Sequence, residues 1–355
     1  MIISMKCRQG VSLSDPSDVL SGDIQRFLHI SEEDHTYTIS ISDDFYESEG
    51  PLALLFDVVE LISRIFPEKL CTIKKVELPR KFRIGPKMGK SEFRKYMGVR
   101  GPSIASSVGL GSILHPSDHA KLFRIMSSAG LDVGFDPPYL RDNEVSPYYD
   151  RAHQIVDSID HIRDDYGKKV LYFMTLPSDL ELLDKAVSIG LKGVYVNLCR
   201  DLARINDVLE FRGRLFLAAR NVGCMSSCGI PLEILLSVLR ELGFDLVERP
   251  AINRQEEVEW VKKLDTIIGD GKSPSMPITS PRIHPGNIIA NVPDDLGVVL
   301  MGDLGVYGHP SGLIKGISSL REILDSFMRG ESLLSVIRRN KDVGVAVEKW
   351  GYLVP

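Results

Sequence analysis

The sequence predicts an α/β protein in which a (β/α)8 TIM barrel follows a small α+β domain. Residues 101–138 read as strand, helix and strand, and the same unit recurs down the chain. Gly190 and Gly243 each stand between the end of a helical stretch and the apolar run that follows it. Glycine suits this joint because it adopts the left-handed conformation that ends helices. Eight such units within about 250 residues are typical of a TIM barrel.

The first unit shows how the elements are identified. Residues 103–110 are mostly β-branched and small, as in a buried strand. Pro116 and Ser117 precede a stretch whose apolar residues recur at three-to-four spacing, which predicts a helix. Residues 131–136 are apolar again. A helix of this length normally crosses over to a parallel strand, so we expect 103–110 and 131–136 to pair in parallel.

Residues 98–355 are predicted to hold the barrel and a C-terminal helical extension. The eight expected strands are 103–110, 131–136, 169–176, 193–199, 215–221, 244–250, 275–280 and 297–303. The helices expected between and after them are 116–129, 147–166, 178–189, 200–211, 231–242, 255–268, 284–291 and 311–329.

Residues 1–97 are predicted to form the α+β domain. Residues 7–13, 35–42 and 70–78 are expected strands, the second with alternating Tyr and Ile. Residues 51–66 form the longest apolar stretch, but it contains Asp, Glu and Arg, so we expect an amphipathic helix rather than a membrane span. A small antiparallel sheet covered by helices on one face is the simplest packing of these elements.

Composition excludes several classes of function. The net charge is −5 and no Lys-rich or Arg-rich block stands out, so nucleic acid is not an expected partner. The five cysteines, at positions 7, 71, 199, 224 and 228, do not form the pattern of a secreted disulfide framework. Without a recognisable signal peptide, the expected location is the cytoplasm.

A TIM barrel carries its chemistry at the carboxyl ends of its strands. Four arginines fall at these ends, and arginines that converge with backbone amides are typical of a site for phosphate or another anion. They are Arg200, Arg220, Arg249 and Arg282, with Asn221 beside the second. An arginine at a strand end also commonly forms a salt bridge at the rim, so the sequence leaves open which of them contact a ligand.

Acid–base candidates lie at the same ends. Glu248 and Asp303 are candidate general bases if burial raises their pKa, although the favoured alternative is that each pairs with a nearby arginine. His284 lies in a loop that is expected to face the site, whereas His309 reads as a turn histidine. Cys224 and Cys228 stand at the i, i+4 spacing of one helix face, which alone is weak support for a metal site.

Six segments, taken in their order and spacing, resemble those of one family. They are PLALLFDVVELISRIFP, GPKMGKSEFRKYMGV, GIPLEILLSVLRELGFD, MPITSPRIHPG, GDLGVYGHPSG and VAVEKWG. The chain in this way resembles the RuBisCO large-subunit superfamily, in particular its RuBisCO-like proteins. The resemblance implies a ferredoxin-like N-terminal domain, a barrel, and a homodimer or higher homo-oligomer. It also implies enolisation of a phosphorylated ketone on a Mg²⁺ ion held by a carbamylated lysine, an aspartate and a glutamate after strand 2.

The family's metal ligands have no counterpart here. Phe135 stands where the resemblance places the carbamylated lysine, and Pro137 and Pro138 stand where it places the two carboxylates. Only Asp136 remains, at a position that binds no metal in the family. Mg²⁺ requires oxygen ligands, which a phenyl ring and two prolines do not supply. We therefore predict no metal cofactor and no carboxylase activity.

The resemblance retains the family's anion-binding positions. Arg220 matches a phosphate-contacting arginine and Ser280 a sugar-contacting serine. Leu304 and Gly305 match a phosphate-binding glycine pair with one glycine lost, and Arg282 replaces a glycine of the same region.

Two hypotheses follow. In the first, the protein binds a phosphorylated or otherwise anionic small molecule between Arg220 and Arg282, and isomerises or enolises it without metal, with Glu248 or Asp303 as base. In the second, it is a non-catalytic relative that serves as an anion-binding or assembly module.

Overall fold

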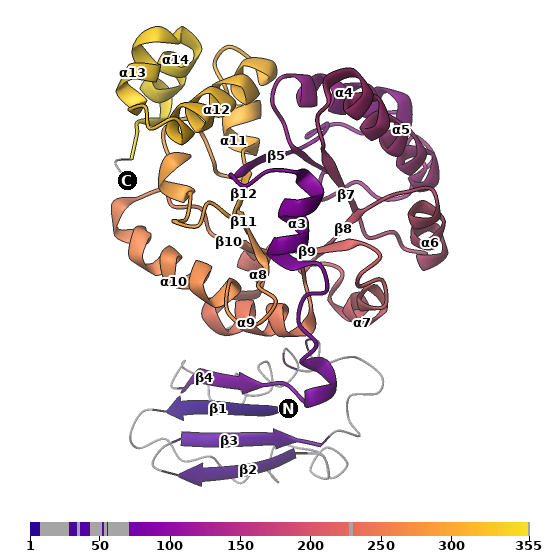
Figure 1. The fold of residues 1–355 in the computed structure, drawn as a ribbon. Helices are drawn as coiled ribbons and strands as arrows, with labels where there is room; N and C mark the ends of the chain where they lie inside the picture. The colour runs from indigo at the N-terminus through magenta and orange to yellow at the C-terminus, as the bar shows by residue number, and fades with distance from the viewer. Residues whose placement is uncertain are drawn as a thin grey trace.

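The computed structural model describes residues 1–7, 28–33, 36–42, 52, 55, 71–226 and 230–353. Two sheets organise this part of the chain, a four-stranded antiparallel sheet near the N-terminus and a closed eight-stranded parallel barrel (Figure 1). The predicted α/β class, with a TIM barrel after a small antiparallel sheet, is confirmed. Within the described residues, the helices are too short or too polar to cross a membrane.

The N-terminal sheet has the strand order β2-β3-β1-β4. Its strands are β1 (Ile2–Cys7), β2 (Leu28–Glu33), β3 (Thr36–Ile41) and β4 (Cys71–Glu77). Alternation explains its core, because Ile3 and Met5 of β1 face the same side and are buried.

The sequence identified β3 and β4 in this sheet. The strand expected at 7–13 shares only Cys7 with β1, and residues 8–13 lie outside the described residues. Within the helix expected at 51–66, the structure describes Leu52 and Leu55, which are helical and buried. The other residues of this segment lie outside the described residues.

Helix α3 (Gly89–Met97) closes the amino-terminal end of the barrel. Its Phe93 and Met97 are buried in the cluster that fills the barrel, and the Phe93 ring lies 5.8 Å from Phe216, edge to face. The Asp245 carboxylate accepts hydrogen bonds from the backbone N–H of Met88 and Gly89, at 2.8 and 2.9 Å. These contacts fix the start of α3 against the base of the barrel.

All eight predicted barrel strands are present and run parallel. They are β5 (Ser103–Ser107), β6 (Val133–Phe135), β7 (Leu171–Thr175), β8 (Gly193–Asn197), β9 (Phe216–Arg220), β10 (Leu246–Arg249), β11 (Met276–Thr279) and β12 (Val299–Met301). Successive residues alternate between two buried layers. In β7, for example, Phe173 faces the barrel interior, whereas Tyr172 faces the layer of helices.

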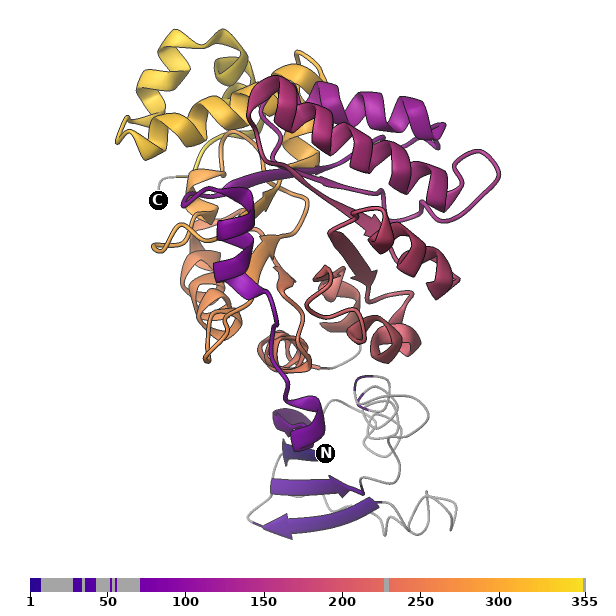
Figure 2. The same cartoon turned by 45° about the vertical axis from the view of Figure 1, so that its right-hand side comes forward.

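Most of the predicted helices surround the barrel. They are α4 (Pro116–Ser128), α5 (Tyr148–Tyr166), α6 (Leu180–Ser188), α7 (Ile205–Leu209), α9 (Leu232–Leu242), α10 (Val258–Ile268) and α12 (Leu313–Met328). Figure 2 shows two long neighbouring helices on one flank, which are α4 and α5. The helix expected at 200–211 is divided between η4 (Leu202–Arg204) and α7, and the one at 255–268 begins with η5 (Gln255–Glu257).

The helix predicted over 284–291 is wrong. Only the short η6 (Ile289–Asn291) forms there. Pro285 and Gly286 interrupt the segment, and a Cβ atom at Gly286 would lie 1.7 Å from the carbonyl oxygen of Gly351. The backbone at Gly286 is thus packed directly against the C-terminal segment, which a regular helix with side chains would not permit.

Four more α-helices lie within the described residues, and the sequence expected only a C-terminal extension. They are α8 (Val222–Ser226), α11 (Asp303–Tyr307), α13 (Leu333–Arg339) and α14 (Lys341–Trp350). Helix α11 follows β12 directly at the carboxyl end of the barrel.

Candidate functional site

The centre of the site is an ion pair between neighbouring strand ends. Arg220 ends β9, Glu248 lies near the end of β10, and both side chains are buried. The Arg220 Nε–H donates to Glu248 Oε2 at 3.3 Å, and the backbone N–H of Asn221 donates to Glu248 Oε1 at 3.2 Å. Asn221 has a φ of 62°, a left-handed conformation that asparagine tolerates better than most residues. This turn brings its N–H to the carboxylate.

The guanidinium of Arg220 lies over two aromatic rings. It is 4.7 Å from the centre of the Phe135 ring and 5.2 Å from that of Tyr195, so both contacts are of the cation–π type. One of its nitrogens, Nη1, is buried and has no hydrogen-bond partner among the described residues. A buried charged donor without a partner is costly, so this nitrogen marks a place where a bound acceptor would be stabilising.

Asp303, at the start of α11, is the second buried carboxylate of the site. Its oxygens accept hydrogen bonds from Ser106 Oγ at 2.7 Å, from Ser107 N–H at 2.6 Å and from Ser107 Oγ at 2.8 Å. The sequence did not identify these serines. Burial raises the pKa of Glu248, opposed by Arg220 and reinforced by the negative charge of Asp303. Glu248 therefore lies within the electrostatic influence of both Arg220 and Asp303.

Only two of the four predicted arginines remain available to a ligand. Arg249 is fully buried and forms a bidentate pair with Asp265 of α10, at 2.7 and 3.1 Å. Arg200 pairs with Asp201 at 3.0 Å and donates to the carbonyl of Pro138. Both are structural contacts. Arg220 is in the site, and Arg282 is exposed, with no ion pair to its side chain in the described part of the chain.

The predicted phosphate-binding amides are not free. The N–H of Leu304 donates to the carbonyl of Pro281 at 3.2 Å, and that of Gly305 donates to the carbonyl of Ile283 at 2.9 Å. Both amides are thus engaged because α11 packs onto the loop after β11, and phosphate binding by this pair stays a prediction. The Ser280 hydroxyl accepts a hydrogen bond from the N–H of Ala251 at 2.9 Å, and its own proton can still be donated.

Neither candidate histidine joins the ion pair. The ring of His284 packs 5.2 Å from that of Trp350, its Nδ1 accepts from the N–H of Gly286, and burial lowers its pKa to about 4. An imidazole so weakly basic is a poor general base near neutral pH. His309 accepts a hydrogen bond from the N–H of Ser311 at 3.1 Å, as expected of a turn histidine.

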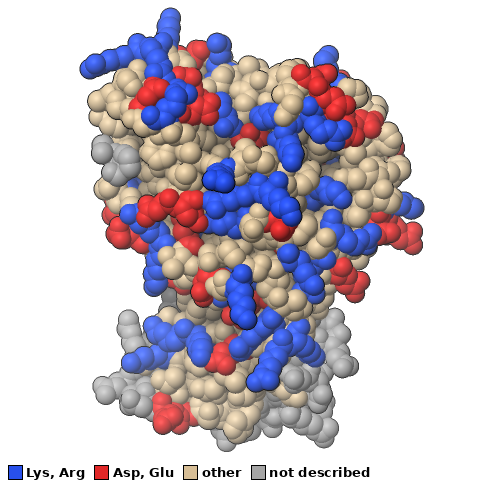
Figure 3. Space-filling model, viewed as in Figure 1, with Lys and Arg blue, Asp and Glu red and all other residues tan. Residues whose placement is uncertain are grey.

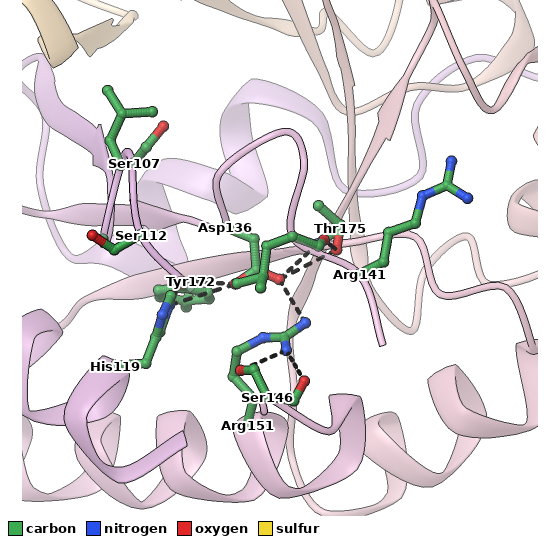
Figure 4. Close-up of polar contacts among 12 residues, drawn as sticks. Ser107, Ser112, His119, Asp136, Arg141, Ser146, Arg151, Tyr172 and Thr175 are labelled. Atoms are coloured by element: carbon green, nitrogen blue, oxygen red, sulfur yellow. Dashed lines mark hydrogen bonds and ion pairs between the residues drawn. The ribbon is translucent and has the colours of Figure 1, made fainter. Parts of the chain in front are cut away.

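The tip of β6 does not fit a magnesium ion. The Phe135 ring is buried inside the barrel, stacked 4.8 Å from Phe173. The Asp136 side chain points toward α5, and both of its oxygens are in use (Figure 4). Oδ1 accepts from the Tyr172 hydroxyl at 2.9 Å, and Oδ2 pairs with Arg151 at 3.2 Å. Prolines supply no side-chain oxygen, so the donor set that Mg²⁺ requires is missing at this tip.

The contacts of Asp136 belong to a buried network that the sequence analysis missed. The hydroxyl of Tyr172 also contacts Nε2 of His119, and Arg151 donates to the carbonyl of Ser146 at 2.7 Å. Burial lowers the pKa of His119 to about 4, so the imidazole is neutral near neutral pH. The residues of this network are far apart in the sequence. The only local sign of it is a polar residue on the apolar face of each of two helices, His119 and Arg151.

Cys199 and Cys224 form a disulfide that joins the end of β8 to α8. The sequence grouped Cys224 with Cys228 and placed Cys199 at the neighbouring strand end, and Cys228 lies outside the described residues. No group of three or more His, Cys, Asp or Glu side chains is placed to hold a metal in the described part of the chain.

Comparison with known proteins agrees with this architecture. No family model matches the chain. The ribulose bisphosphate carboxylase of Archaeoglobus fulgidus is 24% identical over 385 residues, which cover 95% of this chain and 85% of that protein. The 2,3-diketo-5-methylthiopentyl-1-phosphate enolase of Exiguobacterium sibiricum is 28% identical over 246 residues, covering 63% of this chain and 61% of the enolase.

A solved structure shares the whole fold. The RuBisCO-like protein MtnW of Alicyclobacillus acidocaldarius superposes with a TM-score of 0.75 at 18% identity, covering 99% of both chains. At this identity the structural likeness supports the fold, and the curated relatives support the kinship. Together they place the chain in the RuBisCO large-subunit superfamily, whose members include RuBisCO-like proteins.

Proposed function

We propose that this chain is a RuBisCO-like protein that binds a small phosphorylated or carboxylated molecule at the carboxyl end of its barrel and does not carboxylate it. One observation carries the proposal, the buried Arg220 guanidinium whose Nη1 has no partner in the described residues. An anionic oxygen there would complete the donor and add a charge-assisted hydrogen bond. Exposed Arg282, in the loop after β11, is the second cation for the same ligand.

The site has the groups for a proton transfer at carbon. Glu248 accepts the proton from the carbon next to a ketone, the C–H bond breaks, and its electron pair moves to the carbonyl oxygen. Arg220 stabilises the resulting enolate oxygen, and return of the proton to another atom completes an isomerisation or enolisation. A raised pKa suits Glu248 to this work. Asp303 is the weaker candidate because three donors already bind its oxygens.

The substrate class follows from the same chemistry and from a relative. The enolase from Exiguobacterium sibiricum is named for a diketone that carries a phosphate. A phosphorylated ketone would offer this chain both an acidic C–H and an anionic group for the arginines. We propose that the reaction needs no metal at the tip of β6, since Phe135 and the prolines there offer no ligand oxygen.

A second candidate is a non-catalytic anion-binding or assembly module. The observation that favours it is the ion pair itself, because Glu248 neutralises the charge of Arg220 without a substrate. Oligomerisation is proposed in either case. One solved RuBisCO of the same fold, from Hyperthermus butylicus, is named as dimeric, and another, from Pyrococcus horikoshii, as octameric.

Binding of inorganic phosphate and of small phosphorylated ketones, measured by calorimetry, tests the anion site. Arg220→Ala should weaken binding by at least about tenfold, since a charge-assisted hydrogen bond contributes more than 1.4 kcal/mol. Arg254→Ala is the matched control, because this side chain is 73% exposed and its guanidinium lies 3.9 Å from the nearest carboxylate oxygen among the described residues, that of Glu256. Equal affinity of wild type and Arg220→Ala would refute the site.

Proton exchange separates the two candidate functions. An enolising protein should catalyse the exchange of the proton next to the ketone for deuterium, followed by NMR, and Glu248→Gln should abolish that exchange without abolishing binding. A chain that binds the ketone but exchanges no proton is the non-catalytic module.

A further inference from the structure

A basic surface lies at the opposite end of the barrel from the candidate site. Residues 79–100 contain eight Lys and Arg and one acidic residue, Glu92, in a chain whose net charge is −5. The sequence analysis overlooked this concentration because apolar residues and glycines separate the cations. Figure 3 shows Lys and Arg side chains gathered over α3 and continuing toward the N-terminal sheet.

A cleft of about 690 Å³ lies within this surface. Its cationic wall consists of Lys90, Arg94 and Lys95 of α3, together with Arg100. The facing wall includes Asp295.

Apolar groups also line the cleft. Val99, Pro274 and Leu296 contribute to its walls, and Val99 is 41% exposed. Leu296 has a φ of 60°, a left-handed conformation that is unfavourable for leucine and that here belongs to a wall of the cleft. The cleft therefore offers both cations and an apolar contact surface.

The cleft keeps an excess of positive charge. The carboxylate of Asp295 pairs with Lys90. Arg94 donates a hydrogen bond to the carbonyl oxygen of Asp295 and is also attracted by the Asp295 carboxylate, and its Nε is buried without a hydrogen-bond partner in the described chain. Lys95 is 3.6 Å from Glu92, both exposed, and such pairs contribute little. Arg100 is exposed and has no ion pair with any described residue.

The helix that carries most of the cationic wall is anchored to the barrel. Asp245 fixes the first residues of α3, and Phe93 and Met97 are buried in the barrel on the inner face of the same helix. The backbone of α3 therefore holds Arg94 and Lys95 next to each other on one surface, while the Lys95 side chain itself is 79% exposed. A fixed backbone limits the entropy lost on anion binding to that of the side chains.

We propose that this cleft is a second binding site, for a small organic polyphosphate of the nucleotide class. Its phosphates lie against Arg94, Lys95 and Arg100, and its apolar ring system lies against Val99 and Leu296. Arginine favours such ligands because its planar donors match two phosphate oxygens at once. The volume suits one such molecule, since ligand pockets of roughly 300–1,000 Å³ are typical. The site is independent of the function proposed above.

Calorimetry with ATP, inorganic tripolyphosphate and a single-stranded DNA oligonucleotide tests this site at physiological salt. ATP and tripolyphosphate should both bind, and ATP more tightly because only it has an apolar part. Arg100→Ala and Lys95→Ala should each weaken ATP binding by about tenfold. Both side chains are exposed, so neither change should impair folding. Lys121→Ala, an exposed cation of α4, is the matched control and should bind as wild type does.

Arg220→Ala distinguishes the two sites, because it should leave ATP binding unchanged. Three results would each overturn the proposal: no binding of ATP, unchanged ATP affinity in both cleft variants, or loss of ATP binding in Arg220→Ala. Tighter binding of the oligonucleotide than of ATP, with an affinity that falls steeply with salt, would also overturn it. That result would indicate an extended nucleic-acid surface instead.

Discussion

Neutralising Glu248 should strengthen anion binding, although it removes the partner of Arg220. In Glu248→Gln, the charge that lies 3.3 Å from Arg220 disappears, and the amide oxygen can still accept from Asn221. An anion on the far side of the guanidinium would lie roughly 6 Å from that carboxylate. At an effective dielectric constant of about 20, this repulsion amounts to about 3 kcal/mol per unit charge, or roughly a hundredfold in Kd.

The assay is calorimetric titration with sulfate, whose charge does not change in the working range of pH. Because burial raises the pKa of Glu248, its carboxyl takes up a proton as the pH falls, and wild-type affinity for sulfate should rise toward acid pH and then level off. Glu248→Gln should show the high affinity throughout, with little dependence on pH. Weaker binding in the variant, or identical pH profiles in the two proteins, would refute the reasoning.

Three further predictions concern stability. Arg151→Met leaves the fully buried Asp136 carboxylate without its counter-charge, so urea unfolding should show a loss of about 3–5 kcal/mol; a loss below about 1 kcal/mol would contradict the network. Reducing the Cys199–Cys224 disulfide, which closes a separation of 25 residues, should lower the free energy of unfolding by about 3 kcal/mol, and a thiol assay should find these two cysteines unreactive beforehand. The pKa of His119 is lowered to about 4, so the unfolded chain takes up this proton first; stability should fall as the pH drops from about 6.5 to 4, and His119→Gln should flatten part of that fall.

The barrel was predictable because each of its units carries a local signal. The small and β-branched residues of β5 and the spacing of α4 are visible within a short window of sequence, and the crossover rule then pairs the strands. The helix expected at 284–291 failed for a non-local reason. The contact between Gly286 and Gly351 joins segments that no local pattern connects.

The site was only partly predictable for a similar reason. Its strand ends could be located, so Arg220 and Glu248 were identified together. Which arginine stays available depends on partners elsewhere in the chain, and Arg249 is taken up by Asp265 of a neighbouring helix. The acceptors of the Leu304 and Gly305 amides belong to another loop, so no local pattern in the sequence indicates these hydrogen bonds.

The most direct test of the account is a crystal structure of the protein grown with both sulfate and Mg²⁺. We expect a sulfate bound to the Arg220 guanidinium at the carboxyl end of the barrel, with no cation between Phe135 and Pro138. A magnesium ion at the tip of β6, or the absence of bound sulfate at Arg220, would contradict the account.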